Sequence, residues 1–124
     1  QEIRLYVFTA KEVSLYDPKT HSLTKVAKGD HRGIVAANQP FSKEAPVSLL
    51  MVADMDKFGS KGEHAQAMVA VDTGIVTENI NLFCSAAGLA TVTRGTMDSK
   101  AISALLGLTE NQIPLINNPV GYLK

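Results

Sequence analysis

Residues 88–98, GLATVTRGTMD, join the end of an apolar helical segment to the start of a second one. Gly88 is typical of a helix C-terminus, and residues 89–92 have the alternation of a short strand. Arg94 and a glycine then follow, and both are unusual at the end of a buried strand. Either residues 93–96 contact a ligand, or Arg94 lies on the surface of an ordinary strand-to-helix loop.

The segment before this stretch predicts a long helix over residues 65–87. Its apolar side chains occupy two faces, which is wider than the single stripe of a surface helix. One face carries Met68, Val71, Ile75 and Leu82, and the other carries Val69, Val76, Ile80 and Phe83. We expect the helix to be buried on more than one side, with a partner subunit as the second cover, because so short a chain offers few neighbours. Asn79 and Asn81 either make polar contacts in that interface or face solvent.

Strand patterns occupy the first half and the end of the chain. Residues 3–8 alternate, and residues 12–26 predict a hairpin around a Pro-containing turn. Residues 47–53, VSLLMVA, are apolar enough for a strand buried on both faces at the sheet centre. Residues 112–124 predict a closing strand in which Pro119 marks an edge or a bulge.

Two connecting segments have distinct signals. Residues 54–64 combine glycine and charge with little periodicity, and predict a mobile loop whose Phe58 either folds back on the body or covers a ligand. Further along, Asp98 or Ser99 is expected to cap a second helix that ends at Gly107.

Composition excludes several classes of protein. The 124 residues, 45% of them hydrophobic, are enough for one domain with a core. Twelve basic and twelve acidic residues give no net charge, so no general attraction to nucleic acid or anionic membrane is expected. No apolar run approaches the roughly 18 residues of a membrane span. Cys84 is the only cysteine and is expected to be a buried hydrophobe.

Self-sufficient catalytic motifs are also missing from the sequence. The three histidines fall in separate segments, which argues against a metal site, and neither a nucleophile elbow nor a phosphate loop occurs. An enzyme built this way must take its reactive atom from a cofactor.

One family has the same order of features. The run DTGIVTENINLFCSAAGLATVTRGTMD, followed by an amphipathic helix and LGLTENQIPLINNPVGY, resembles the second half of the flavin-dependent nitroreductase superfamily. There an Asp-x-Gly helix with a polar Asn pair leads to a Gly-Leu-x-Thr strand, and a Gly-Tyr pair closes the sheet. QEIRLYVF resembles the segment after that family's Asn-x-Gln motif, and VSLYDPKTHSLTKVAKGDHRG resembles a hairpin of the branch that includes the azoline oxidases of peptide maturation.

The resemblance implies an α+β, nitroreductase-like fold with a central, mainly antiparallel sheet and a long buried helix at a dimer interface. Residues 1–124 would be the carboxyl-terminal portion of one such domain, and the protein a homodimer with two FMN sites between its subunits. Six positions match FMN-contacting positions of the family: Gln1, Thr93, Arg94, Gly95, Thr96 and Lys124.

These positions would have different tasks. The loop at residues 93–96 would pass the edge of the flavin ring, where glycine permits close approach and a backbone N–H stabilises developing charge. Arg94 would pair with the phosphate or the pyrimidine end of the ring. Lys124 would reach the phosphate, and Gln1 would be the glutamine of the family motif.

The activity implied is hydride transfer from NADH or NADPH through FMN to an electron-poor acceptor, a nitro compound or a quinone, in a ping-pong reaction without a catalytic side chain. The alternatives are a flavin-free binding or regulatory module, or an oxidase of peptide azolines. The expected location is the cytoplasm, or the periplasm if a preceding segment carries a signal peptide.

Overall fold

Six strands form one sheet at the centre of the molecule. The computed structural model describes residues 2–123. Every neighbouring pair of strands is antiparallel, in the order β3-β2-β1-β4-β6-β5, which confirms the predicted α+β class. The strands are β1 (Ile3–Phe8), β2 (Glu12–Asp17), β3 (Ser22–Lys28), β4 (Val47–Asp54), β5 (Leu89–Thr91) and β6 (Gln112–Tyr122).

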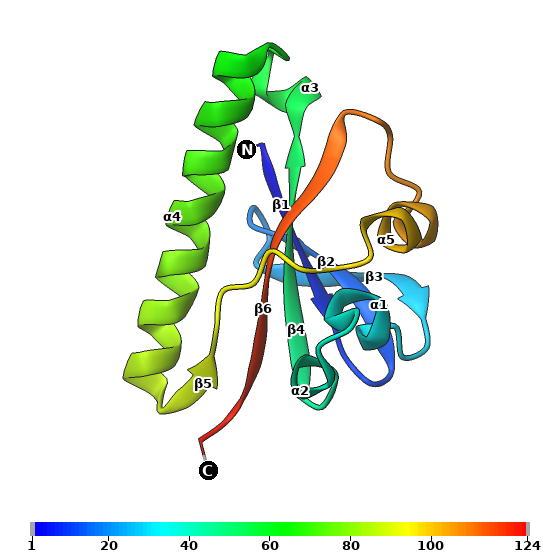
Figure 1. Ribbon diagram of the computed structural model, residues 1–124, viewed down its shortest axis with the longest axis vertical. Coiled ribbons are helices and arrows are strands. Elements are labelled where there is room, and N and C mark those ends of the chain that lie inside the picture. The colour runs from blue at the N-terminus through cyan, green and yellow to red at the C-terminus, as the bar shows by residue number, and fades with distance from the viewer. Residues whose placement is uncertain (1, 124) are drawn as a thin grey trace.

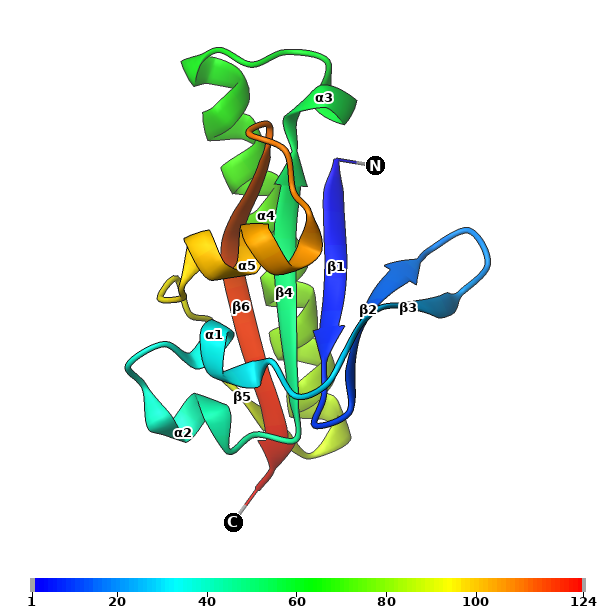
Figure 2. The same ribbon diagram turned by 90° about the vertical axis from the view of Figure 1, so that its right-hand side faces the viewer.

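Helices lie on both faces of this sheet (Figures 1 and 2). The long helix α4 (Glu63–Ala87) covers one face. Three short helices cover the other: α1 (Arg32–Ala36), α2 (Pro40–Lys43) and α5 (Ser99–Leu106). The remaining helix, α3 (Met55–Phe58), follows β4 at one end of the sheet. The β2–β3 hairpin projects from the body in Figure 2.

Alternating side chains of β4 separate two hydrophobic cores. Leu50 and Val52 point to the core beneath α1 and α5, whereas Ala53 points to the core beneath α4. All three are at most 1% exposed, so β4 is buried on both faces as its sequence predicts.

The segment after β4 contains more helix than predicted. The Asp54 carboxylate accepts hydrogen bonds from the backbone N–H groups of Asp56 and Lys57, which caps α3, and Gly59 ends it in the left-handed conformation. Phe58 packs on the core beneath α4, so it folds back on the body. The prediction of a loop is wrong for residues 55–58 and 63–64, which are helical, and right for residues 59–62. The four-residue helix was missed because it has too few positions to show a period.

Helix α4 is buried along one narrow stripe only. Its buried side chains are small or polar and recur about every fourth residue, which lets the helix lie close to the sheet: Ala65, Val69, Thr73, Thr77 and Cys84. Most side chains of the two apolar faces predicted to be buried are exposed, among them Met68, Val71, Ile75, Leu82 and Phe83. The predicted long helix is confirmed. The structure does not show it buried on more than one side within this chain. Its burial by a partner subunit stays a prediction.

Candidate functional site

The loop at residues 93–96 begins where the pairing between β5 and β6 breaks. Thr91 pairs with Val120, and the next regular pair is Arg94 with Asn117 in the same register. Between them Pro119 has no N–H to donate toward the carbonyl of Val92, so the ladder is interrupted for two residues. The carbonyl of Pro119 accepts instead from the Thr91 hydroxyl at 2.8 Å.

Pro119 therefore has a role other than the one predicted. It lies in β6, which has β4 on one side and β5 on the other, so it does not mark an edge strand. The irregularity between β4 and β6 lies at Leu115, where Met51 and Val52 pair with Ile116 and Pro114. A proline is tolerated here because its nitrogen faces β5, on the side of β6 where the strand pairing is interrupted and no N–H donor is needed.

The Arg94 side chain points into the protein. It is 6% exposed, and four of its five N–H groups have acceptors in the chain. Nε donates to Oε1 of Gln39 at 2.7 Å. Nη1 donates to the carbonyl of Val35 at 3.1 Å and to Oδ1 of Asn117, and Nη2 donates to the carbonyl of Ala36 at 2.9 Å.

These contacts change the expected role of Arg94. The two carbonyls belong to the last turn of α1, so the guanidinium caps that helix and ties it to the sheet. Burial lowers the pKa of Arg94, but from a value so high that it stays charged. With four donors engaged, the guanidinium is not presented as a clamp for a phosphate. The surface arginine considered as the alternative is wrong, because the side chain is buried. Sequence alone could not predict the contact with Gln39, which lies 55 residues away.

Asn117 holds the loop from the face that carries α1 and α5. Its backbone N–H and C=O both pair with Arg94 at 2.8 Å. Its side-chain Nδ2 donates to the carbonyl of Thr96 at 3.0 Å, and its Oδ1 accepts from Arg94.

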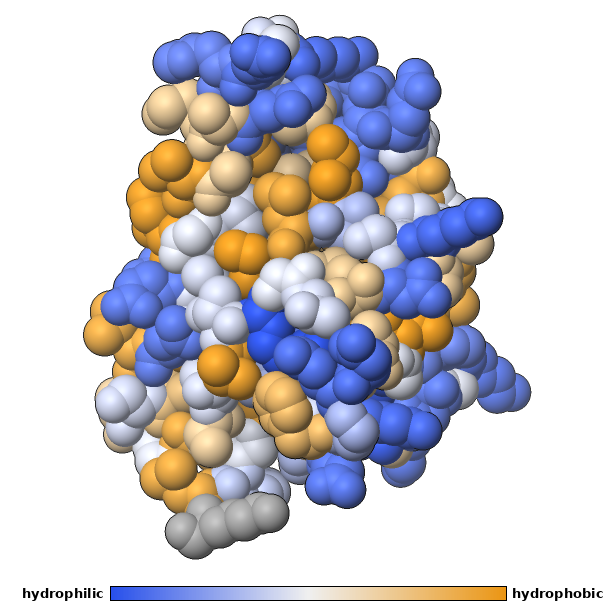
Figure 3. Space-filling model, viewed as in Figure 1, coloured by the Kyte–Doolittle hydropathy of each residue, from blue (hydrophilic) through white to orange (hydrophobic). Residues whose placement is uncertain are grey.

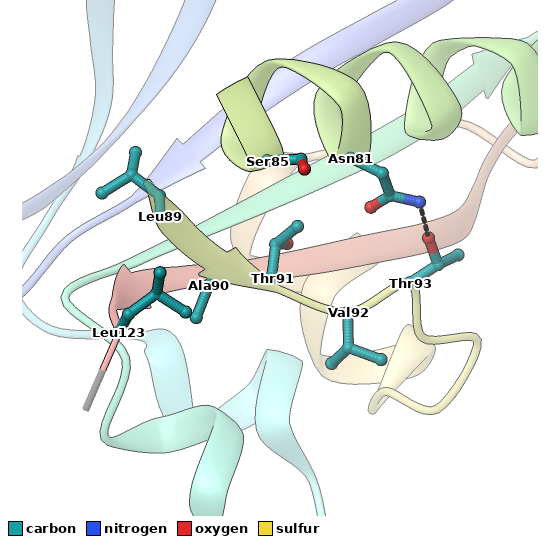
Figure 4. A pocket seen from close by; sticks show the side chains of 8 residues that line it. All are labelled: Asn81, Ser85, Leu89, Ala90, Thr91, Val92, Thr93 and Leu123. Carbon is teal, nitrogen blue, oxygen red and sulfur yellow. Dashed lines mark hydrogen bonds between the residues drawn. The ribbon is translucent and has the colours of Figure 1, made fainter. Parts of the chain in front are cut away.

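Asn118 holds α4 against the sheet from the opposite face. Its Nδ2 donates to Oδ1 of Asn81 at 3.0 Å and to the Thr91 hydroxyl at 3.2 Å, and its Oδ1 accepts from Thr77. The hydroxyl of Thr93 lies 2.8 Å from that of Thr77 and accepts from Asn81 at 3.1 Å (Figure 4). Asn81 thus makes its polar contacts inside the chain, where neither predicted alternative placed them.

Asn117 and Asn118 are the residues of this region that the sequence analysis missed. The available signal was their position, because these two amides stand in the run LINNPV, which is otherwise apolar. Both are 0% exposed, and buried amides require partners.

The outer side of the loop is open. Gly95 does not have a positive φ, and a Cβ added there would meet nothing within 4 Å, so neither backbone nor packing inside the chain requires glycine. The backbone N–H groups of Thr93, Gly95 and Thr96 have no acceptor among residues 2–123. These exposed donors can bind an acceptor atom that comes from outside the chain.

Two grooves flank the strand that leads to this loop. One, of about 660 Å³, lies between α4 and β5; Figure 4 shows its lining, which includes Asn81, Ser85 and Thr93. The other, of about 620 Å³, lies on the far side of β5 and includes Phe41, Val92 and Tyr122. Phe41 also lies over the Arg94 guanidinium, 5.8 Å from ring centre to Cζ.

The remaining predicted features divide as follows. Thr93, Arg94, Gly95 and Thr96 are together by sequence, whereas Gln1 and Lys124 lie outside the described residues. Within residues 2–123 no cluster of three His, Cys, Asp or Glu side chains could hold a metal ion. Over the same residues no helix has the length and apolar character needed to cross a membrane.

Comparison with known proteins assigns the class. The chain belongs to the Nitroreductase family, whose model matches residues 1–122. A nitroreductase-family protein of Methanocaldococcus jannaschii is 28% identical, over 96% of this chain and 61% of the relative. A crystal structure of a nitroreductase-family protein from Ralstonia eutropha has a TM-score of 0.90 at 26% identity, and covers 100% of this chain and 59% of that one.

A third similarity concerns the fold alone. A chain of the Escherichia coli microcin synthetase McbBCD complex with truncated pro-MccB17 has a TM-score of 0.85 at 16% identity, covering 99% of this chain and 52% of that one. This chain thus spans between half and about 61% of the length of these relatives, so their whole activity is not carried over to it directly.

Proposed function

We propose that this chain is part of an FMN-dependent oxidoreductase that passes hydride from NADH or NADPH to an electron-poor acceptor, a nitro compound or a quinone. Membership of the Nitroreductase family supports an oxidoreductase. The observation that carries the proposal further is the open outer side of the loop at residues 93–96, with its free N–H groups and a glycine that nothing inside the chain requires.

The residues present fit one edge of a flavin. Thr93, Gly95 and Thr96 would hold that edge through backbone N–H groups, beside a groove of about 660 Å³. Bound FMN would supply the atom that accepts and donates hydride. Fixed N–H donors at the ring edge would stabilise the negative charge that arises there, and they require no rearrangement during the reaction.

Other parts of the predicted site are not supplied by the described residues. Arg94 is engaged inside the protein, so a phosphate would need another cation. Binding of the phosphate by Lys124 stays a prediction, and so does the contact of Gln1 with FMN. The reacting partners would sit over the ring, and their correct placement would account for much of the rate.

We propose in addition that the complete protein is a homodimer joined through α4. Met68, Ile75 and Leu82 are spaced by seven residues, and each is at least 41% exposed. This spacing places them along one side of the helix, as in the seam of a helix pair.

The test of the flavin proposal is the substitution Gly95→Val in the complete protein. A branched side chain there would meet open space in the chain but would obstruct a ring at the loop. We expect unchanged thermal unfolding and a dissociation constant for FMN at least about tenfold higher, measured by quenching of flavin fluorescence.

Gly62→Val is the matched control, because Gly62 also has open space around its Cβ but lies at the start of α4. It should bind FMN like the wild type. If the wild-type protein binds no FMN and does not oxidise NADH or NADPH with a nitro compound or quinone, the proposed function is wrong and the flavin-free module is favoured. If the Gly95→Val protein and the wild type bind FMN with equal affinity, the loop at residues 93–96 does not contact the flavin.

A further inference from the structure

We infer that Asn117 is a positioning residue that fixes the peptide groups of residues 94–96, so that Gly95 presents its N–H outward to a ligand. The identity of that ligand as FMN rests on the proposed function. The fixing of the loop by Asn117 does not.

Four hydrogen bonds join Asn117 to this segment. Its backbone N–H donates to the carbonyl of Arg94 and its carbonyl accepts the Arg94 N–H, both at 2.8 Å. The side chain adds one bond at each end of the segment, accepting from Nη1 of Arg94 and donating to the carbonyl of Thr96 at 3.0 Å. Both ends of the loop are therefore tied to one buried residue.

The direction of the free donors follows from peptide geometry. A trans peptide group is planar and its C=O and N–H point in opposite directions. The carbonyl of Arg94 is directed at Asn117, so the N–H of Gly95, in the same peptide group, is directed away from β6. The carbonyl of Thr96 is directed at the Asn117 side chain, so the N–H of Met97 points away in the same manner.

Only an amide side chain satisfies both of these side-chain contacts. Asp has no donor for the Thr96 carbonyl, and an apolar side chain has neither donor nor acceptor. Asn117 is 0% exposed, so water would not readily replace a lost partner. The N–H groups of Gly95 and Met97 are thus held in place before any ligand arrives, which lowers the entropic cost of binding.

The neighbouring residue provides a matched control. Asn117→Asp keeps the volume and the acceptor for Arg94, and replaces the donor to Thr96 by an oxygen. Asn118→Asp replaces the same group one residue later, at the same burial, and it disturbs contacts with Thr77, Asn81 and Thr91 on the other face. The new carboxylate at 117 lies against Arg94, whereas the contacts of residue 118 are all neutral, so the general cost of a buried charge falls more heavily on the control. Both variants lose buried hydrogen bonds, but only the first loosens residues 94–96.

Two measurements on the complete protein separate these effects. Amide hydrogen exchange without FMN should be about tenfold faster at Arg94 and Asp98, whose N–H groups are hydrogen-bonded at the two ends of the loop, in Asn117→Asp than in Asn118→Asp. The dissociation constant for FMN should rise about tenfold in Asn117→Asp and change less than about twofold in Asn118→Asp. Asn117→Ala, which is neutral and has neither donor nor acceptor in its side chain, should act in the same direction and serves if the aspartate variant does not fold.

The outcomes are distinguishable from those of the proposed function. If the wild type binds no FMN, that function fails, and faster exchange in the Asn117 variants alone still supports the fixing of the loop. Equal exchange in the Asn117 and Asn118 variants overturns the inference. Faster exchange at Arg94 and Asp98 with unchanged FMN affinity overturns it as well, because the orientation of the loop would then have no bearing on the ligand.

Discussion

The guanidinium of Arg94 joins three parts of the molecule that are distant in the sequence. It contacts the end of α1, the side chain of Gln39 before α2, and Asn117 in β6. The planar fork of arginine reaches acceptors in several directions, whereas the ammonium of lysine is a single point with three donors. Its role is thus a property of shape as well as of charge.

Arg94→Lys should therefore destabilise the protein by about 1–3 kcal/mol, because three donors at a single point leave at least one of the four acceptors, three of which are buried, without a donor. The measurement is urea unfolding. Arg4→Lys is the control: Arg4 makes one ion pair, at 3.2 Å with Asp54, and its side chain is 28% exposed, so the cost should stay below about 1 kcal/mol. Similar costs at the two positions would contradict the structural role of Arg94.

At the scale of elements, Asp54 connects the end of β4 to α3. Burial raises the pKa of this carboxyl group. The hydrogen bonds from Gln112 and the Lys57 N–H, together with the charge of Arg4, lower the pKa by more than burial raises it, so it lies below its ordinary value of 3.8. A carboxyl group whose pKa is lowered by folding stabilises the folded state above the unfolded pKa, and this contribution is lost as the pH falls through the folded pKa.

Asp54→Asn should accordingly cost about 1–2 kcal/mol at pH 7, since asparagine keeps a capping oxygen but loses the charge. The difference from the wild type should be constant between about pH 5 and pH 8 and should shrink below about pH 4. Urea unfolding at each pH measures it. Arg32 lowers the pKa of Asp30 to about 2, but both proteins share that pair, so its titration cancels in the difference. A difference that grows in acid would refute the assignment.

The elements that the sequence predicts well are those with local signals. The hairpin of β2 and β3, the doubly buried β4 and the Asp98 cap of α5, whose carboxylate accepts the Ala101 N–H at 3.1 Å, all depend on neighbouring residues. Pro119 was misassigned because strand order is a long-range property. The same limit applies to the candidate site: unusual residues in the sequence point to the loop at residues 93–96, but the partners of Arg94 depend on the folded chain.

At the scale of the whole molecule, the apolar face of α4 lacks a cover within residues 2–123. Figure 3 shows hydrophobic residues along the side of the molecule that α4 occupies. Ile75 is 57% exposed and Leu82 60%. Because these side chains make little contact inside the chain, polar replacements should leave the fold of one subunit intact.

The double substitution Ile75→Glu and Leu82→Glu should convert the complete protein from dimer to monomer, because like charges would face one another across a desolvated helix pair. Sedimentation velocity at micromolar concentration measures the change, and circular dichroism should show unaltered helix content. Gln66→Glu, an exposed polar position on α4, is the control and should remain dimeric. A variant that stays dimeric would place the interface elsewhere, and a monomeric wild type would mean that the face of α4 is covered by something other than a second copy.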